Sequence, residues 1–600
     1  MDFLVVVLLG VIAIVGVSAA STQGRHSVAA PLMLVLLGAG ISFIPGMPTI
    51  EIEPEWILAG VLPPLLYSTA VSLPTMDFRR DFAAIGTLAV VLVIITSVVL
   101  GFVFSALLPQ LGLAGGIALG AILSPTDAVA TSITKRLGAP PRVVTVLEGE
   151  GLLNDASALV LLRSAIAATA ATVSFGHIVA DFIWAVIGAV LVGFAVGSVG
   201  LWARKKIDSS ALTTAVSFIV PFVAYLPAER LGASGLVAVV VAGLVTGHGA
   251  AKHLTPQDRM FDYSNWHTAE TLLEGGLFLL MGLEASTLVK DVVSEHGSLW
   301  HAVGVAALAG VIVLAVRALF VAPLLYKLRM TAEKKAVNRE RFTQVQTRLD
   351  ARLAVEGNNE TMTFPPKPGW NQRPPWGDEP RVGTVSTARV KKFRTMLVRR
   401  AADIDYLVAK PLGRREGALI VWAGMRGVVT LAAALTLPTT IIHRSFLVLV
   451  AFGVAGGTLL VQGGTMPWVM RRLGIMGQGA VSPEEMRAVR AVMDAAGHTL
   501  IDNPKLRRRD GEIYDPTVVK RVQIDFASES LSDEAVEDET EPQLEQYREL
   551  QMRLIEVQRK ALLVARKEGV HDARFLERSL GVLDAAQITL EMKTAGTASH

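Results

Sequence analysis

The 600-residue sequence contains no cysteine and few charged side chains. Without cysteine the chain has no disulfide bond, no thiolate metal ligand and no cysteine nucleophile. Charged residues make up 18% of the chain, whereas 52% of its residues are hydrophobic. The formal net charge is only +3, and the basic residues fall in short stretches and not in one patch, which argues against nucleic acid as a partner. This composition is typical of an integral membrane protein.

About thirteen apolar segments are each near the length that crosses a bilayer. They lie at 3–20, 28–44, 56–73, 82–108, 113–133, 143–172, 178–203, 211–226, 234–248, 270–289, 299–326, 415–437 and 445–470. The first lacks the basic start of a signal peptide, so we expect it to be retained. Basic residues gather in alternate loops, as at Lys135, Arg136 and Arg142. By the positive-inside rule, we predict an all-α multi-pass protein of the plasma (inner) membrane, with its N-terminus outside and its C-terminus in the cytoplasm.

Two polar regions stand outside the predicted transmembrane domain, which comprises residues 1–326 and 415–474. Residues 327–414 form a cytoplasmic insertion between the eleventh and twelfth spans. This insertion begins with a basic, helical pattern and continues into a segment rich in proline and tryptophan at 363–383, which we interpret as a loop or linker. Residues 475–600 form a mainly helical cytoplasmic tail, whose first helix is indicated by Ser482 and Pro483.

The fifth span is interrupted by the sequence Ser124-Pro125-Thr126-Asp127. Pro125 removes a backbone donor and clashes with the preceding turn, so the helix should break near Ser124. A break inside the hydrocarbon is tolerated only where protein or a water-filled cavity surrounds it. Asp127 would then lie at the N-terminus of the second half, where the helix dipole favours a negative charge. A cap at an interfacial loop is the alternative, but apolar sequence continues on both sides.

Broken helices in transporters usually occur as a pair related by an inverted repeat. The twelfth span is the natural partner of the fifth, because it carries Arg426 between Gly424 and Gly427. The two spans are seven apart in order, so they run through the membrane in opposite directions. We therefore predict two inverted six-span repeats, spans 1–6 and 8–13, joined by the seventh span.

The sixth span places Glu150, Asn154 and Asp155 in the hydrocarbon, where an ionised group costs about 2.5–3.5 kcal/mol. Glu150 and Asn154 share one helix face, and Gly151 and Asp155 share another. An unpaired Arg426 would be as costly as an unpaired Glu150, so we predict that these two form an ion pair. Asp155 then remains able to hold either a proton or a monovalent cation. The alternative, polar contacts that only join helices, does not account for the neighbouring broken span.

Four motifs resemble those of the monovalent cation:proton antiporter-1 family, the NhaP and sodium/proton exchanger group. SPTDAVA at 124–130 and EGEGLLND at 148–155 are similar to its paired ion-site motifs. LPPLLY at 62–67 and GMRGVVT at 424–430 are similar to its third and twelfth spans. The resemblance implies a homodimeric antiporter in the lipid membrane. It also implies a six-helix core domain that moves like an elevator and in which the fifth and twelfth spans cross. No cofactor is implied, because Na⁺ or another monovalent cation and H⁺ are the substrates.

The resemblance also implies roles for individual residues. Thr126 and Asp127 would line the ion site, Asp155 would bind the cation or proton, with Thr126 as a further cation ligand, and Asn154 would support Asp155. An asparagine followed by an aspartate is the pattern of the electroneutral branch. This chain departs from the family at Gly151, where a serine is common, and at Ser68, where some members have an acidic residue. A weaker or less Na⁺-selective site is therefore expected.

The sequence thus predicts a secondary active transporter that exchanges Na⁺, and also Li⁺, for H⁺ by alternating access, with cation and proton competing for Asp155. K⁺/H⁺ exchange by the same mechanism is the main alternative. A passive cation channel has less need of a titrating site between broken helices. A membrane-embedded enzyme is not supported, because no span carries a His-x-x-x-His pair and no Ser/His/Asp arrangement is evident in the sequence.

Overall fold

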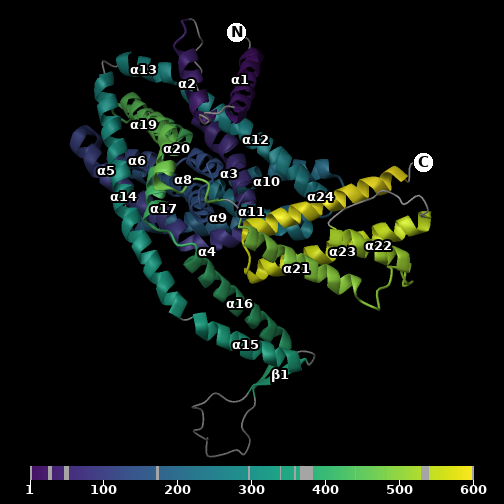
Figure 1. Ribbon diagram of the computed structural model, residues 1–600. Coiled ribbons are helices and arrows are strands. Elements are labelled where there is room, and N and C mark those ends of the chain that lie inside the picture. The colour runs from purple at the N-terminus through teal and green to yellow at the C-terminus, as the bar shows by residue number, and fades with distance from the viewer. Residues whose placement is uncertain are drawn as a thin grey trace, which may run out of the picture. The chain divides into compact units, whose positions relative to one another are not determined.

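The computed structural model is mainly helical (Figure 1). The structure describes residues 3–23, 30–45, 53–170, 175–294, 298–337, 339–356, 360–364, 383–438, 441–479, 482–528 and 540–597. The chain divides into two compact units, Met1–Leu328 with Leu412–Ala480, and Arg329–Pro411 with Val481–His600. The polar insertion and the tail are far apart in the sequence, but most of both regions belongs to the second unit.

Each predicted span overlaps one helix or a series of consecutive helices. The helices are α1 Phe3–Gln23, α2 Ala30–Ser42, α3 Leu62–Ser72, α4 Thr75–Gly86, α5 Val93–Leu107, α6 Gly112–Leu123, α7 Ala128–Arg136, α8 Pro141–Ala170, α9 Phe175–Arg204, α10 Ser210–Arg230, α11 Gly235–His253, α12 Pro256–Leu283, α13 Ala285–Ser294, α14 Leu299–Val337, α17 Arg414–Trp422, α18 Val428–Leu435, α19 Arg444–Thr458 and α20 Gly464–Leu473. Within the described residues, nine helical stretches are long and apolar enough to cross a membrane, and three shorter apolar helices accompany them. The predicted all-α polytopic fold is confirmed.

Several helices extend beyond their predicted spans; α12 begins at Pro256, for example, whereas the tenth span was expected to begin at residue 270. The eleventh span was expected to end at residue 326, whereas α14 continues to Val337. The added residues, KLRMTAEKKAV, are mostly strong helix formers, so the backbone stays helical after its apolar stretch ends.

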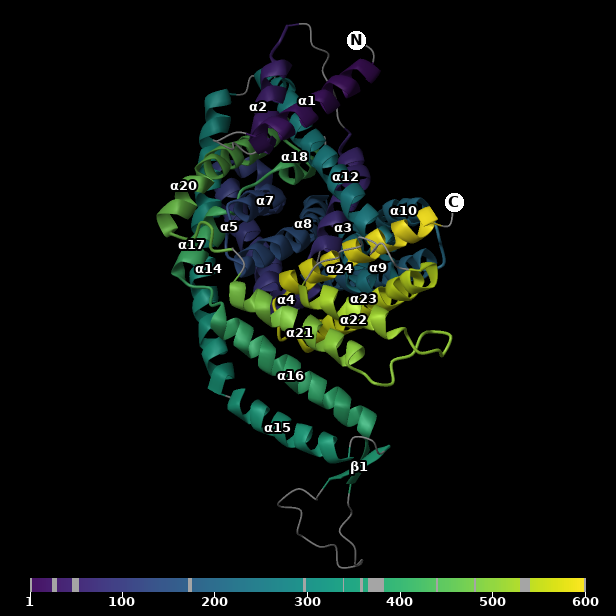
Figure 2. The ribbon, with the colours of Figure 1, turned by 45° about the vertical axis from the view of Figure 1, so that its right-hand side comes forward.

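The helices of the first unit pack in two groups. One group contains α1, α2, α3, α9, α10, α11 and α12, and the other contains α4 to α8 and α17 to α20. Helix α8 lies in the middle of the unit, where it contacts α4, α6 and α7 in its own group and α3 and α11 in the other (Figure 2). Residues on α8 are therefore placed at the boundary between the two groups.

Small residues allow α5 and α6 to approach closely. A Cβ on Gly116 would lie 2.5 Å from the Gly101 carbonyl oxygen, and one on Gly120 would lie 2.5 Å from the Ser97 carbonyl oxygen. Close contact between small residues is a principal source of helix association in lipid, where no hydrophobic effect drives it. This packing holds α6, the first half of the interrupted fifth span, against its neighbour.

The second unit joins the insertion to the tail. Its elements are α15 Arg339–Glu356, β1 Thr361–Phe364, β2 Gly383–Ser386, α16 Thr387–Ala409, α21 Pro483–Ile501, α22 Pro516–Ser528, α23 Glu541–Glu568 and α24 Ala573–Thr597. The strands pair antiparallel, from Thr361 with Ser386 to Phe364 with Gly383. Helices α15 and α16 lie side by side (Figures 1 and 2). Most of the predicted linker, residues 365–382, lies outside the described residues.

Ion pairs connect the insertion with the tail inside this unit. The Arg394 guanidinium on α16 lies 2.6 Å from an Asp350 oxygen on α15 and 3.0 Å from a Glu568 oxygen on α23. The Lys410 ammonium, at the end of α16, lies 2.6 Å from an Asp572 oxygen. The Arg394 contacts are partly exposed, so each contributes modestly to stability. Together they define how the two segments pack.

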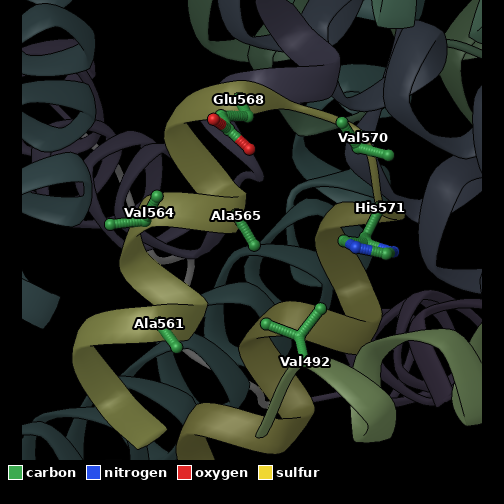
Figure 3. A pocket seen from close by; sticks show the side chains of 7 residues that line it. All are labelled: Val492, Ala561, Val564, Ala565, Glu568, Val570 and His571. Carbon is green, nitrogen blue, oxygen red and sulfur yellow. The ribbon is translucent and has the colours of Figure 1, made fainter. Parts of the chain in front are cut away.

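A pocket of about 390 Å³ lies within the second unit (Figure 3). It is lined by Val492, Ala561, Val564, Ala565, Glu568, Val570 and His571. Partial burial lowers the pKa of His571, and the carboxylates of Glu485 and Glu568 act in the opposite direction. The ring is therefore mainly neutral at physiological pH, as suits a pocket with mostly apolar walls.

Candidate ion-binding site

The fifth span is interrupted in the middle of the first unit. Helix α6 ends at Leu123 and α7 begins at Ala128, so Ser124 to Asp127 form a non-helical link. Asp127 caps α7, because its carboxylate accepts a hydrogen bond from the Val129 N–H at 3.1 Å. A negative charge at this helix N-terminus is favoured by the dipole and by the unpaired N–H groups of the first turn.

The twelfth span is interrupted in the same way, and the two links touch. Helix α17 ends at Trp422 and α18 begins at Val428. The Asp127 N–H donates to the Met425 carbonyl at 2.9 Å, so each link supplies a hydrogen-bonding partner for the other. Two irregular backbone segments thus satisfy each other at a depth where lipid offers no partner.

Gly427 lies in close contact with the Asp127 carboxylate. A Cβ on this glycine would lie 1.2 Å from Asp127 Oδ2, so no larger residue fits without moving the carboxylate. We predict that Gly427→Ala displaces Asp127, abolishes most transport and destabilises the fold by about 1–3 kcal/mol, as overpacking does. The measurement is proton flux in proteoliposomes together with thermal unfolding in detergent.

Gly457→Ala is the matched control for this substitution, because a Cβ on Gly457 meets no atom within 4 Å. It should leave both flux and stability near those of the parent protein. Parental flux in Gly427→Ala would show that the position of the Asp127 carboxylate is not needed.

Helix α8 contributes Glu150, Asn154 and Asp155 to this crossing. All three are buried, with 1%, 1% and 6% of their surface exposed. The Asn154 side-chain amide donates to Thr126 Oγ1 at 2.6 Å, and that hydroxyl donates to Glu150 Oε1 at 3.4 Å. The structure therefore links Asn154 to the broken span through Thr126, and the support of Asp155 by Asn154 stays a prediction.

Four buried side-chain oxygens around the crossing have no hydrogen-bond partner among the described residues. They are Oδ2 of Asp127, Oδ1 of Asn154, Oδ1 of Asp155 and Oγ1 of Thr430. Thr430 lies in the first turn of α18 and was not among the site residues predicted from the sequence. Buried polar atoms are normally satisfied, so these unpaired oxygens are candidates for contact with a further partner. Carboxylate, amide and hydroxyl oxygens are the ligands that hard cations prefer.

The predicted ion pair between Glu150 and Arg426 is wrong. Glu150 instead pairs with Arg317 on α14, where guanidinium Nη2 lies 2.7 Å from Glu150 Oε2 and Nη1 donates to Oε1. Arg317 Nε also donates to the Ile420 carbonyl at 3.0 Å, and only 1% of the Arg317 surface is exposed. This bidentate geometry is the strongest arrangement that an arginine and a carboxylate can form.

Arg426 finds main-chain partners instead of a carboxylate. Its Nε donates to the Leu123 carbonyl at 2.9 Å, its Nη2 donates to the Ser124 carbonyl at 3.3 Å, and its Nη1 donates to the Gly424 carbonyl. The ends of broken helices leave such carbonyls unpaired and carry the negative end of the dipole. The prediction failed because it considered only carboxylates as partners for a buried guanidinium.

Arg317 and Glu270 were not predicted as functional residues, although each is a charged residue within a predicted span. Arg317 is the one Asp, Glu, Lys or Arg residue in the predicted eleventh span, and a charge at that depth is by itself a reason to suspect a role. Glu270 on α12 accepts a hydrogen bond from Ser68 Oγ at 3.2 Å. Ser68 on α3 therefore lies beside a carboxylate, which is supplied by Glu270 on α12.

Gly151, the other position at which this chain departs from the family pattern, has space for a small side chain. A Cβ on Gly151 would lie 3.8 Å from the Thr126 carbonyl oxygen, which is an ordinary van der Waals contact. The position therefore accommodates a small side chain without rearrangement, and the glycine is not required by close packing.

Two interrupted helices that cross beside buried carboxylates, in a bundle of membrane-length helices, are the mark of secondary transporters. Residues 7–345 match the model of the family described as "Sodium/hydrogen exchanger, transmembrane". Because this match covers more than half of the chain, the protein belongs to the sodium/hydrogen exchanger family. It is a transporter and not an enzyme, and the resemblance read from the motifs is confirmed.

Curated relatives agree with this family. The chain is 27% identical to an uncharacterised Na⁺/H⁺ exchanger of Mycobacterium tuberculosis over 97% of its own length and 96% of that protein. It is 34% identical to a "Sodium, potassium, lithium and rubidium/H(+) antiporter" of Bacillus pumilus, over 42% of this chain and 39% of that one. The long match to the mycobacterial protein includes the region of the insertion and the tail.

A solved structure shares the fold. The sodium proton antiporter MjNhaP1 from Methanocaldococcus jannaschii superposes with a TM-score of 0.51 over 79% of this chain and 99% of that chain. The two sequences are 17% identical, so this likeness shows the fold alone.

Proposed function

We propose that this protein exchanges one monovalent cation, Na⁺ or Li⁺, for one H⁺ across its membrane, with both ions competing for Asp155. The observation that carries the proposal is the set of unpaired buried oxygens on Asp127, Asn154, Asp155 and Thr430, among the residues that the structure describes. A buried carboxylate favours its neutral form, so it binds a proton when no cation neutralises it. Since one carboxylate holds either ion but not both, the two ions cross in opposite directions.

The charges around the crossing support an electroneutral exchange. Glu150 is neutralised by Arg317, and Arg426 supplies a positive charge at the same crossing as Asp127. Asn154 is uncharged. These groups together leave one exchangeable negative charge, on Asp155, which corresponds to one cation for one proton.

Potassium is the second candidate substrate. The Bacillus pumilus relative is named for potassium and rubidium as well as sodium and lithium. Gly151 lacks the hydroxyl that is common at its position in the family, and Ser68 lacks the carboxylate that some members have at its position, so a less Na⁺-selective site is expected.

The setting of the exchange is proposed from the charge pattern and the family. Basic loops place the ends of α7 and α9 on the cytoplasmic side of the plasma (inner) membrane, with the N-terminus outside and the insertion and tail inside. A homodimer, in which one helix group of each subunit moves against the other group, accords with the two packing groups of the first unit. Lipid and small inorganic cations are the partners.

Proton flux in proteoliposomes tests this function. Gradients of Na⁺, Li⁺ and K⁺ are imposed in turn while the membrane potential is clamped, and the internal pH is followed with a fluorescent dye. Exchange should alkalinise or acidify the lumen according to the direction of the gradient, and the ranking of the cations assigns the substrate. Cation entry without coupled proton movement would indicate a passive channel and refute the proposal.

A further inference from the structure

An ion pair joins the two packing groups of the first unit. Arg163 lies on α8, the helix that carries Asp155, and Glu229 lies near the end of α10, which belongs to the other group. The Arg163 guanidinium Nη1 lies 2.9 Å from Glu229 Oε2. Neither residue is part of the ion site described above. The pair therefore connects the helix that presents the ion ligands with the group that packs opposite it.

The pair lies at the end of α8 that is remote from the basic loops. Helix α8 begins beside Arg142, in a basic loop, and Arg163 lies about 30 Å further along its axis at the usual helical rise. This distance is close to the thickness of the hydrocarbon core, and Asp155 lies between the two ends. Helix α10 likewise follows a basic loop and ends beside Glu229. With the basic loops in the cytoplasm, the pair lies at the outer face.

The turn that follows Glu229 is fixed to its own helix group. Glu229 Oε1 accepts a hydrogen bond at 2.9 Å from the N–H of Gly235, the first residue of α11. The Ser234 N–H donates to the Ala185 carbonyl on α9 at 3.0 Å, and the Trp184 side chain on α9 donates to another carbonyl of this turn. One carboxylate oxygen is thus held by the turn, and the other contacts α8.

The pair is too exposed to contribute much to the stability of the fold. The side chains of Arg163 and Glu229 are 58% and 24% exposed, and such pairs are worth little. Its effect on the arrangement of the helix groups is a separate matter. A contact this short is lost when the groups shift by a few ångströms, and a contact made in only one of two arrangements favours that arrangement.

We propose that the Arg163–Glu229 pair holds the helix groups together at the outer face and so stabilises the arrangement in which the ion site opens to the cytoplasm. The proposal rests on the exchange by alternating access proposed above. In each cycle the groups separate at the outer face, so the pair breaks and forms again. Since Arg163 and Asp155 share one helix, the pair acts on the ion site through the position of α8. Both members are positioning residues and not ion ligands.

Arg163→Ala and Glu229→Gln test the pair from its two sides. Glutamine keeps an oxygen that can accept from the Gly235 N–H, so the turn is preserved. Exchange is measured in everted and in right-side-out membrane vesicles with Na⁺, Li⁺ or K⁺, whichever the parent transports best. The apparent KM should fall at the outer face and rise at the cytoplasmic face, because the outward arrangement gains population. The ratio of the two KM values should change by about 1.5- to fivefold, the factor that an exposed ion pair supplies.

The double variant Arg163→Ala with Glu229→Gln distinguishes one contact from two separate effects. Its KM ratio should equal that of either single variant, because each substitution removes the same contact. Arg230→Ala is the matched control, since it removes an exposed charge next to Glu229, and it should keep the parental ratio. An unchanged ratio in the single variants would overturn the proposal, as would a double variant with the product of the two shifts. Equal changes in KM at both faces would indicate a structural role and would also overturn it.

The absence of cysteine from the chain allows a second, direct test. Arg163→Cys and Glu229→Cys are combined and joined by a short bis-methanethiosulfonate reagent. Cross-linking should stop exchange, and reduction with dithiothreitol should restore it, whereas each single-cysteine variant should keep its exchange after the same treatment. Unchanged exchange in fully cross-linked protein would show that the groups do not separate here. If the parent itself shows no cation-coupled flux, the exchange function fails instead, so the two failures are distinguishable.

Discussion

Asp155→Asn should reduce cation-driven proton flux to the level of liposomes without protein. Asparagine has nearly the same shape as aspartate, so the packing of α8 is preserved, but its amide neither takes up nor releases a proton in the physiological range. The variant also loses the charge that balances a bound cation. Because Asp155 Oδ1 has no hydrogen-bond partner among the described residues, no structural bond is lost with it.

The control for this result is Asp181→Asn, the same substitution at an exposed carboxylate on α9. It should leave the flux at the parental level. Thermal unfolding and size-exclusion chromatography in detergent should show that Asp155→Asn is folded. Retained exchange in the folded Asp155→Asn protein would remove this residue from the transport cycle and move the exchangeable charge to Asp127.

Arg317→Ala should destabilise the protein by about 3–5 kcal/mol, the range found when one partner of a buried ion pair is removed. Glu150 would be left ionised and buried without its bidentate partner, at 1% exposure. The Ile420 carbonyl would lose its hydrogen bond as well. The change is measured as the loss of folded, monodisperse protein with temperature in detergent.

A double variant, Glu150→Gln with Arg317→Met, separates the cost of the unpaired charge from the loss of packing. It removes both charges and keeps most of the side-chain volume, so it should recover most of the stability that Arg317→Ala loses. Arg317→Lys should be intermediate, because an ammonium cannot form the bidentate contact. If Arg317→Ala unfolds at the parental temperature, the pair is not a stabilising contact.

The interruption of the fifth span was predictable because its cause is local. Pro125 cannot continue a helix that needs its N–H, and the surrounding apolar sequence keeps the break at membrane depth. Asp127 as the cap of α7 follows from the same short segment. Glu150, Asn154 and Asp155 were predictable for a related reason, since polar side chains in hydrocarbon are expensive and are retained for a purpose.

Which arginine pairs with Glu150 was not predictable from the sequence. Arg426 in the twelfth span was expected, whereas Arg317 on α14 forms the pair. Arg317 and Arg426 both lie within apolar predicted spans, and either satisfies the charge balance. The choice depends on which guanidinium lies beside the carboxylate and which lies beside the carbonyls at the helix breaks. Only the packing of α14 against α8 and of α6 against the α17–α18 link distinguishes them.

Contacts between distant segments were likewise absent from the sequence pattern. Ser68 and Glu270 are 202 residues apart, and Arg394 and Glu568 are 174 apart. Hydrophobic periodicity and residue type indicate local structure and burial. They therefore predict the spans, the helix breaks and the polar residues inside the spans. They carry no distance between helices. The Glu150–Arg317 ion pair and the contacts between the insertion and the tail form only when the helices pack, because packing brings together side chains that are far apart in the sequence.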